Sequence, residues 1–169
     1  KIEPLFEDVD CVFHLAAEAR IQPTIENPRL AVQTNVLGTC NILQAARENG
    51  VKRVVYSSTS SAYGLSNPIP NTEDMPKDCL NPYSVSKTAG EELCQMYTNL
   101  FELETIIFRY FNVYGPGEEH KGNMASVAYQ AWDKGLFKLF PNKPKRDFVY
   151  IDDVVDATLY PVFNEVPKG

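Results

Sequence analysis

The sequence of 169 residues has no glycine-rich turn of the Gly-x-Gly-x-x-Gly or Gly-x-x-Gly-x-x-Gly type, the usual cradle of a dinucleotide pyrophosphate. Positive charge is scarce too, since the formal net charge is -6. A protein that binds nucleic acid needs clustered Lys and Arg to displace phosphate counterions. We therefore expect no nucleic-acid partner.

Long hydrophobic runs and metal-binding cysteine patterns are missing as well. No apolar run approaches the ~18 residues of a membrane span, and residues 1–8 do not have the pattern of a signal peptide. The cysteines show no C-x-x-C spacing, which favours structural thiols in a reducing compartment over a metal or redox site. These cysteines are Cys11, Cys40, Cys79 and Cys94. We expect a soluble, cytoplasmic protein with no membrane partner and no metal.

What is present is a regular alternation of strand and helix patterns. The apolar run at 11–17 ends in small residues, as a parallel strand covered on both faces does. Further along the chain, the patterns predict helices at 28–49 and 82–101 and strands at 52–58 and 104–111. This order implies right-handed crossovers and a parallel sheet, which is an α/β, doubly wound architecture.

The helix at 28–49 is predicted to bury one stripe and to stop at Gly50. The stripe consists of Val32, Val36, Cys40, Leu43 and Ala46. Towards the carboxyl end we expect a helix at 124–134, an extended segment at 137–140 and a helix that Asp152 caps and that runs to Phe163. The residues at 59–81 form a long loop, the kind that often serves an active site.

Tyr83 and Lys87 are the first candidates for chemistry. Asn81 and Pro82 form an N-cap and first-turn pair, so both candidates fall in the first turns of the helix at 82–101. Four residues apart on a helix, they share one face, where an ammonium favours the phenolate of a tyrosine. Thr59 ends the preceding strand and could hydrogen-bond the same substrate oxygen. The alternative is a solvated helix face, because Tyr-x-x-x-Lys by itself is a weak motif.

Six stretches in order strengthen the first interpretation. They are His14-Leu-Ala-Ala17, Asn35-Val-Leu-Gly-Thr39, Ser57-Ser-Thr-Ser-Ser-Ala-Tyr-Gly64, Tyr83-x-x-x-Lys87, Arg109-Tyr-Phe-Asn112 and Arg146-Asp-Phe-Val-Tyr-Ile-Asp-Asp153. In these, the chain resembles the extended short-chain dehydrogenase/reductases, in particular their nucleotide-sugar epimerase/dehydratase branch. The resemblance covers nearly the whole chain.

The resemblance implies a set of site residues and NAD as cofactor, with NADP left open because the strand that reads the ribose is not in this sequence. Thr59, Tyr83 and Lys87 would be catalytic. The implied cofactor-binding residues are Leu15, Ala16, Ala17, Asn35, Ser57, Ser58, Tyr83, Lys87 and Phe111. Asn112 and Arg146 would hold the diphosphate of a nucleotide sugar. Alternatively, Asn35 and Asn112 are capping or turn residues, and Arg146 forms a surface pair with Asp147.

Within the branch, two activities are resembled. The segment from Tyr110 to Ser126 is similar to ADP-heptose 6-epimerases, in which the residue matching Lys121 is a second acid/base, and the amino-terminal half is similar to UDP-glucose 4-epimerases. Dehydratases of this branch have Thr-Asp-Glu where this chain has Thr59-Ser-Ser61. The implied reaction is therefore NAD(P)-dependent epimerisation of a nucleotide sugar by hydride transfer through a keto-sugar.

The first part of the resembled fold has no counterpart in this sequence. We expect residues 1–169 to form a single truncated Rossmann-like domain: a partial doubly wound parallel sheet with helices on both faces, missing its first strands. The substrate-binding region would begin at about residue 113. Without the glycine-rich turn we expect weak or no NAD binding, and an unpaired edge strand that favours a homodimer. The alternative function is a non-catalytic nucleotide-sugar-binding or interaction fragment.

Overall fold

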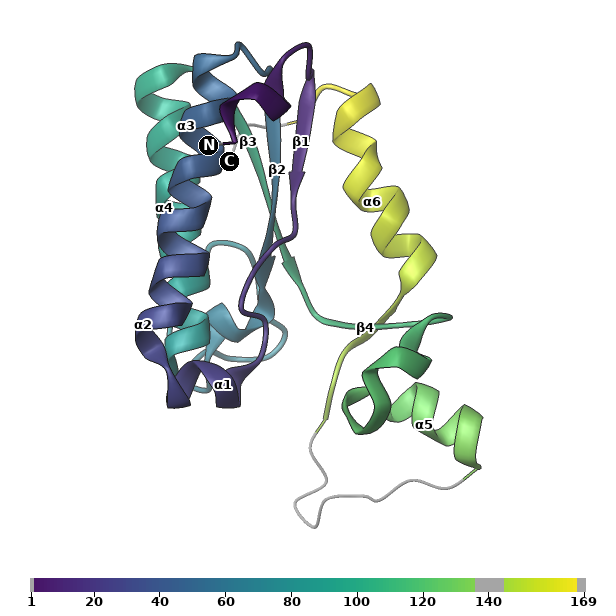
Figure 1. Ribbon diagram of the computed structural model, residues 1–169. Helices are drawn as coiled ribbons and strands as arrows, with labels where there is room; N and C mark the ends of the chain where they lie inside the picture. The colour runs from purple at the N-terminus through teal and green to yellow at the C-terminus, as the bar shows by residue number, and fades with distance from the viewer. Residues whose placement is uncertain (1, 136–144, 167–169) are drawn as a thin grey trace. The chain divides into compact units, whose positions relative to one another are not determined.

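The computed structural model describes residues 2–135 and 145–166, and the chain divides into two compact units (Figure 1). The first unit comprises Lys1–Arg109 and Glu165–Gly169, and the second comprises Tyr110–Asn164. Among the described residues, no helix combines the length and the apolar character that crossing a membrane requires. Each unit is described below by itself.

The first unit is built on a sheet in the order β1-β2-β3. Its strands are β1 (Cys11–His14), β2 (Arg53–Thr59) and β3 (Glu104–Tyr110). β1 and β2 run parallel, with Cys11 opposite Arg53 and His14 opposite Tyr56. The predicted α/β class is therefore confirmed. β1 is shorter than the predicted strand at 11–17, so the residues after His14 leave the sheet at its carboxyl edge, where parallel folds bind ligands.

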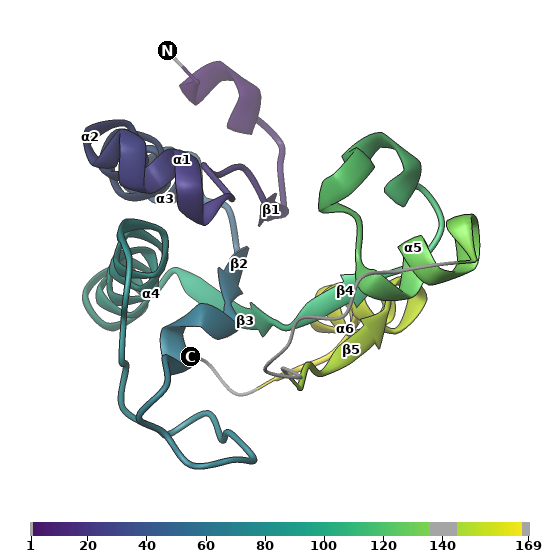
Figure 2. The ribbon, with the colours of Figure 1, turned by 90° about the horizontal axis from the view of Figure 1, so that it is seen from below.

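The helices of this unit lie along one face of the sheet (Figure 2). They are α1 (Ile21–Glu26), α2 (Pro28–Ala31), the π-helical η2 (Val32–Leu37), α3 (Gly38–Glu48) and α4 (Pro82–Phe101), with a 3₁₀-helix η1 (Glu3–Phe6) before β1. α2, η2 and α3 follow one another without a break, as the predicted helix at 28–49 requires. Gly50 ends it with a φ of 70°.

The buried stripe of this helix is shifted by one residue in its first half. Ala31, Asn35 and Thr39 are the buried residues there, whereas the predicted Val32 is 51% exposed. A π-helical turn holds more residues than an α-helical turn, so it displaces a stripe that follows the α-helical period. From Leu43 onward the predicted stripe is confirmed. The helix thus buries polar residues beside the carboxyl end of β1 and apolar residues further along.

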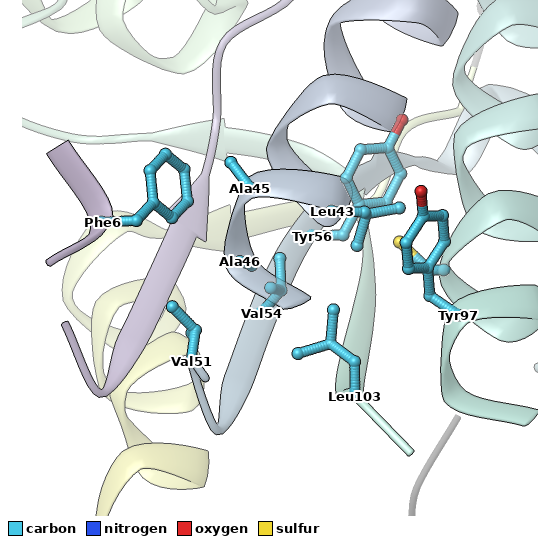
Figure 3. Packing of buried hydrophobic residues seen from close by; sticks show 10 residues of the cluster. Phe6, Leu43, Ala45, Ala46, Val51, Val54, Tyr56, Tyr97 and Leu103 are labelled. Carbon is cyan, nitrogen blue, oxygen red and sulfur yellow. The ribbon is translucent and has the colours of Figure 1, made fainter. Parts of the chain in front are cut away.

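The apolar core of the first unit lies between α3, α4 and the sheet (Figure 3). Leu43 on α3, Val54 and Tyr56 on β2, and Tyr97 on α4 all belong to it, and Tyr56 is completely buried. Burying a side chain of this size contributes about 1.5–3 kcal/mol. This core fixes α4 against β2, the two elements that carry Thr59, Tyr83 and Lys87.

The predicted helix at 82–101 has the bounds of α4. Asn81 caps it, as predicted: its Oδ1 accepts a hydrogen bond from the Ser84 backbone N–H at 2.9 Å, and the Ser84 hydroxyl accepts one from the Asn81 N–H at 3.2 Å. The helix ends where Glu102 adopts a left-handed conformation. This reciprocal capping box sets the position of the first two turns.

The second unit contains β4 (Asn112–Tyr114) and β5 (Phe148–Tyr150), which pair in parallel. Its helices are the 3₁₀-helix η4 (Glu118–Met124), α5 (Val127–Lys134) and α6 (Ile151–Phe163). α5 begins three residues later than the predicted start at 124, because the Ser126 hydroxyl accepts a hydrogen bond from the Tyr129 N–H and forms the N-cap. The predicted extended segment at 137–140 lies outside the described residues.

The predicted cap of the last helix is wrong. Asp152 is not the N-cap of α6, because Ile151 is already helical and the extended Tyr150 takes the N-cap position. Asp152 instead lies in the first turn, where its negative carboxylate interacts favourably with the positive end of the helix dipole. The predicted end at Phe163 is confirmed.

Candidate active site

Lys87 lies in the second turn of α4 and is the buried cation of the first unit's site. Its side chain is 2% exposed, and its Nζ lies 4.2 Å from the centre of the Tyr56 ring. Burial lowers the pKa of Lys87 to about 8, since removal from water disfavours the ammonium. Tyr83 is one helical turn before it and is partly buried. Their place on one helix is confirmed, and their roles stay predictions.

Thr59 is the last residue of β2, so it lies at the carboxyl edge of the sheet. It is 6% exposed, and its Oγ1 accepts a hydrogen bond from the Ser61 N–H at 3.1 Å. This bond caps the 3₁₀-helix η3 (Ser60–Tyr63) and orients the hydroxyl. An oxygen that accepts in this way retains its own proton for donation, as hydrogen bonding to a substrate oxygen requires.

The two serines before Thr59 differ in their surroundings. The Ser58 hydroxyl donates to Glu91 Oε1 at 2.5 Å, so it is bonded to α4. The Ser57 Oγ is buried and has no hydrogen-bond partner within the described part of the chain. Successive residues of a strand point to opposite faces, which accounts for the difference. Their predicted position at the nicotinamide side remains a prediction.

Glu91 was missed by the sequence reasoning, although it continues the four-residue spacing of Tyr83 and Lys87. Its carboxylate is 1% exposed and accepts two hydrogen bonds from Arg109, at 2.9 and 2.8 Å. Lys77 lies 3.2 Å away. Burial opposes ionisation, but the hydrogen bonds from Arg109 and Ser58 outweigh it and hold the pKa of Glu91 below its usual value. A buried, fully paired carboxylate thus joins the loop, β2, β3 and α4.

Asn35 is buried and braces the segment that follows β1. Its Oδ1 accepts from the Glu18 N–H at 2.7 Å, and its Nδ2 donates to the Glu18 carbonyl and to the Ser86 hydroxyl. The side chain therefore stabilises a turn, as the alternative interpretation expects, and links that turn to α4. Between β1 and Glu18, Leu15 is 63% exposed, Ala16 is exposed and Ala17 is partly buried. Their cofactor contacts stay predictions.

His14 is the last residue of β1. Its Nε2 lies 2.9 Å from the Thr39 hydroxyl, and its ring centre lies 5.7 Å from that of Tyr56. Burial, helped by the nearby Lys87 charge, lowers the pKa of His14 to about 4. His14 is therefore neutral at pH 7, and it adds no positive charge beside Lys87.

The remaining candidates belong to the second unit. Asn112 donates from Nδ2 to the Asp147 carbonyl at 2.9 Å, so it joins β4 to the start of β5. Arg146 is exposed and donates to the Lys145 carbonyl. Over the residues that the structure covers, no ion pair joins Arg146 to Asp147, so the alternative of a surface pair is not observed. Phe111 is partly buried just before β4.

Lys121 lies in η4 and its side chain is 51% exposed. Its Nζ is 3.5 Å from Oε1 of Glu118, whose side chain is 4% exposed. The other oxygen of Glu118 accepts a hydrogen bond from the Ser126 N–H at 2.6 Å. Glu118 therefore holds the start of α5 and reaches Lys121 as well. The predicted acid/base role of Lys121 stays a prediction.

The second unit also contains a pocket of about 540 Å³ that the sequence analysis did not predict. Aromatic side chains dominate its lining, which includes Tyr114, Tyr129, Trp132 and Tyr150. Its charged lining residue is Glu119, which would repel a diphosphate. These lining residues suit an apolar or planar group. No single motif of the sequence predicts such a pocket.

Both the sequence and the fold of this chain match known proteins. The chain is 39% identical over 160 residues to a putative UDP-glucose 4-epimerase of Methanocaldococcus jannaschii, covering 91% of this chain and 52% of that protein. Among solved structures, UDP-glucose 4-epimerase of Thermotoga maritima with UDP-glucose matches with a TM-score of 0.86 and 30% identity, over 96% of this chain and 55% of that one.

A second structure is that of Thermus thermophilus UDP-glucose 4-epimerase in complex with NAD, with a TM-score of 0.83 and 33% identity over 97% of this chain and 57% of that one. The chain spans about half the length of these relatives. The model of the NAD dependent epimerase/dehydratase family matches residues 1–166. With the alternation of strands and helices and the Tyr83/Lys87 helix in place, the chain belongs to the NAD dependent epimerase/dehydratase family.

Proposed function

We propose that this chain carries the acid/base residues of an NAD-dependent epimerase that acts on a nucleotide sugar. The observation that carries the proposal is the buried Lys87 ammonium, one turn after Tyr83 on α4. Tyr83 accepts the proton of a sugar hydroxyl as the adjacent C–H bond gives up its hydride, and it returns the proton when the hydride is given back. Lys87 follows Tyr83 by four residues on α4, a spacing that places both side chains on one face of the helix.

The residues at the carboxyl edge of the sheet fit NAD, which supplies a hydride acceptor and donor when bound. Ser57 Oγ is a buried polar atom without a partner among the described residues, as a ligand with an amide edge would need. Leu15 exposes 63% of its surface directly after β1, which suits contact with a planar group. Leu15, Ala16, Ala17 and the serines would hold the cofactor, with Lys87 at a ribose hydroxyl.

On the substrate side, the second unit offers Arg146, Asn112 and Lys121. An exposed guanidinium binds a diphosphate well because its planar fork donates two hydrogen bonds at once. The relatives named above are UDP-glucose 4-epimerases, which favours a UDP-sugar and inversion at carbon 4. Lys121 would act as a second acid/base in that reaction.

We also propose that the protein is cytoplasmic and forms a homodimer. Its four cysteines are all free thiols, as in a reducing compartment. β1 ends the described order of the sheet and carries the 37% exposed Phe13, while the helices expose Val32 and Leu37. An apolar strand at a sheet edge favours association. Light scattering that gives the mass of one stable chain would contradict the dimer.

The second candidate function is a nucleotide-sugar-binding fragment without turnover. It is favoured by the exposed Arg146, because a guanidinium can bind the diphosphate of a nucleotide sugar without taking part in turnover. Calorimetric titration with NAD, NADP and UDP-glucose separates the two. Heat from both ligand classes supports the enzyme, and heat from UDP-glucose alone supports the binding fragment.

Replacing Tyr83 tests the enzymatic proposal most directly. In a preparation that interconverts UDP-glucose and UDP-galactose, we expect Tyr83→Phe to lower kcat about 10²–10⁴-fold, the usual contribution of a general acid/base. UDP-glucose binding, measured by calorimetry, should change little. A Tyr83→Phe protein that keeps its rate would refute the acid/base assignment.

A further inference from the structure

Tyr56 makes two separate contacts with Lys87. The face of its ring lies 4.2 Å from Lys87 Nζ, and its hydroxyl donates to the Lys87 backbone carbonyl at 3.1 Å. Both residues are buried, with exposures of 0% and 2%. An ammonium over an aromatic face is attracted by the negative face of the ring, and more strongly when water is excluded. The residue thus holds both the side chain and the backbone of Lys87.

Gly90 on α4 makes room for this arrangement. A Cβ at Gly90 would lie 2.2 Å from the Tyr56 hydroxyl oxygen and 2.6 Å from the ring carbon that bears it. Tyr56 therefore reaches α4 at a residue without a side chain, about one turn after Lys87 and two turns after Tyr83. Because the ring is rigid and the core surrounds it, it has little freedom to move away.

The other groups around Lys87 do not provide a comparable contact. His14 on β1 is neutral at pH 7, since its pKa is about 4. On α4, burial raises the pKa of the Cys94 thiol to about 12, so this group is uncharged as well. Glu91 is ionised, but Arg109 binds both of its oxygens. The Tyr56 ring is the contact that the structure gives directly to the ammonium.

We propose that Tyr56 is a positioning residue for the reaction: its ring face keeps the Lys87 side chain charged and in place, one helical turn from Tyr83. The inference rests on the proposed function in so far as Lys87 takes part in catalysis. The contact itself is tested without cofactor or substrate. Without the ring the ammonium stays buried, loses its partner and releases its proton more readily.

The test measures the pKa of Lys87 in this chain by NMR, with lysine carrying ¹³C at Cε and the Lys87 signal identified by its loss in Lys87→Arg. Tyr56→Phe keeps the ring face and should leave the pKa within a few tenths of a unit. Tyr56→Leu removes the face and should lower the pKa by about one unit. Val51→Ala, a core change at the start of the sheet, is the control for general loosening.

Tyr56→Leu could unfold the chain, so a shape-preserving series completes the experiment. Phenylalanine carrying one, two and then three ring fluorines at position 56 weakens the negative face stepwise without changing the packing. The pKa of Lys87 should fall with each fluorine. An equal pKa across the series, or a folded Tyr56→Leu with the wild-type value, would overturn the proposal.

Turnover gives a second and independent readout. In an active preparation, Tyr56→Leu should lower kcat and shift the pH profile of kcat while KM changes little, and Tyr56→Phe should restore both. A Tyr83→Phe enzyme that keeps its rate would refute the proposed function, yet it would leave the Lys87 titration unchanged. The two failures are therefore distinguishable.

Discussion

The two units differ in how they hold several of their candidate residues. In the first unit, Lys87, Glu91 and Asn35 are each 2% exposed or less, and hydrogen bonds, ion pairs or an aromatic ring fix their side chains. In the second unit, Arg146 is exposed and Lys121, which is half exposed, has a contact with Glu118 at 3.5 Å. The named residues of the first unit are therefore held in place by the fold, whereas those two residues of the second unit face solvent. Preorganised groups need no reordering at the moment of reaction.

The largest effect should come from the buried carboxylate of the first unit. Glu91→Ala leaves Arg109 and Lys77 without their shared anion, and breaking a buried pair in this way costs about 3–5 kcal/mol. Urea unfolding measures this loss. The control is Glu92→Ala, whose 66% exposed carboxylate also pairs with Lys77 and should cost about 1 kcal/mol or less. Equal losses of unfolding free energy in Glu91→Ala and Glu92→Ala would show that burial does not strengthen the Glu91 ion pairs.

The same carboxylate predicts an acid dependence of stability. The pKa of Glu91 is held below its ordinary 4.5 in the fold, so its stabilisation is complete above the unfolded pKa and is lost as pH falls through the folded pKa. We expect the difference in unfolding free energy between wild type and Glu91→Ala to be constant near neutral pH and to shrink below about pH 4.5. A difference that grows on acidification would have the wrong sign.

An intermediate effect should separate the two asparagines. Asn35→Ala removes two partly buried hydrogen bonds to the Glu18 backbone and a buried one to the Ser86 hydroxyl, which costs about 1–3 kcal/mol. Asn112→Ala removes one exposed bond to the Asp147 carbonyl, and water can replace it, so the loss should be below about 1 kcal/mol. Thermal unfolding followed by circular dichroism ranks the pair. The reverse order would show that the second unit is the tightly held one.

The smallest effect on stability should come from Lys121. Lys121→Ala removes a long contact of a half-exposed side chain, so the free energy of unfolding should change by no more than about 0.5 kcal/mol. A fall in kcat in the same variant would then reflect chemistry and not folding. An unchanged kcat would assign Lys121 to the surface, and a large loss of stability would contradict the open character of the second unit.

Local patterns predicted most of the elements that carry the candidate residues. Asn81-Pro82 predicted the start of α4, and the apolar runs predicted the three strands, because capping and periodicity act between residues that are near in sequence. The same reasoning mistook Asp152 for a cap and did not predict α1, β4 or β5. Short elements bury too little surface to have a strong period of their own.

Local sequence patterns could not predict which side chains the candidate residues contact. Glu91 and Arg109 are 18 residues apart and meet across the packing of α4 on the sheet. Asn35 and Ser86 are separated by 51 residues. The burial of Asn35 in place of a neighbouring valine depends on a π-helical turn, and no residue type marks such a turn.

By itself, the sequence determined the alternation of strands and helices, the turn of helix that carries Tyr83 and Lys87, and the family. Only the tertiary structure decided that Lys87 lies over Tyr56 and that Glu91 is buried with Arg109. The physical reason is that pKa values and ion pairs depend on exclusion from water, which arises when distant segments pack together. The motif identifies the candidate reacting groups, and the fold determines whether those groups are protonated.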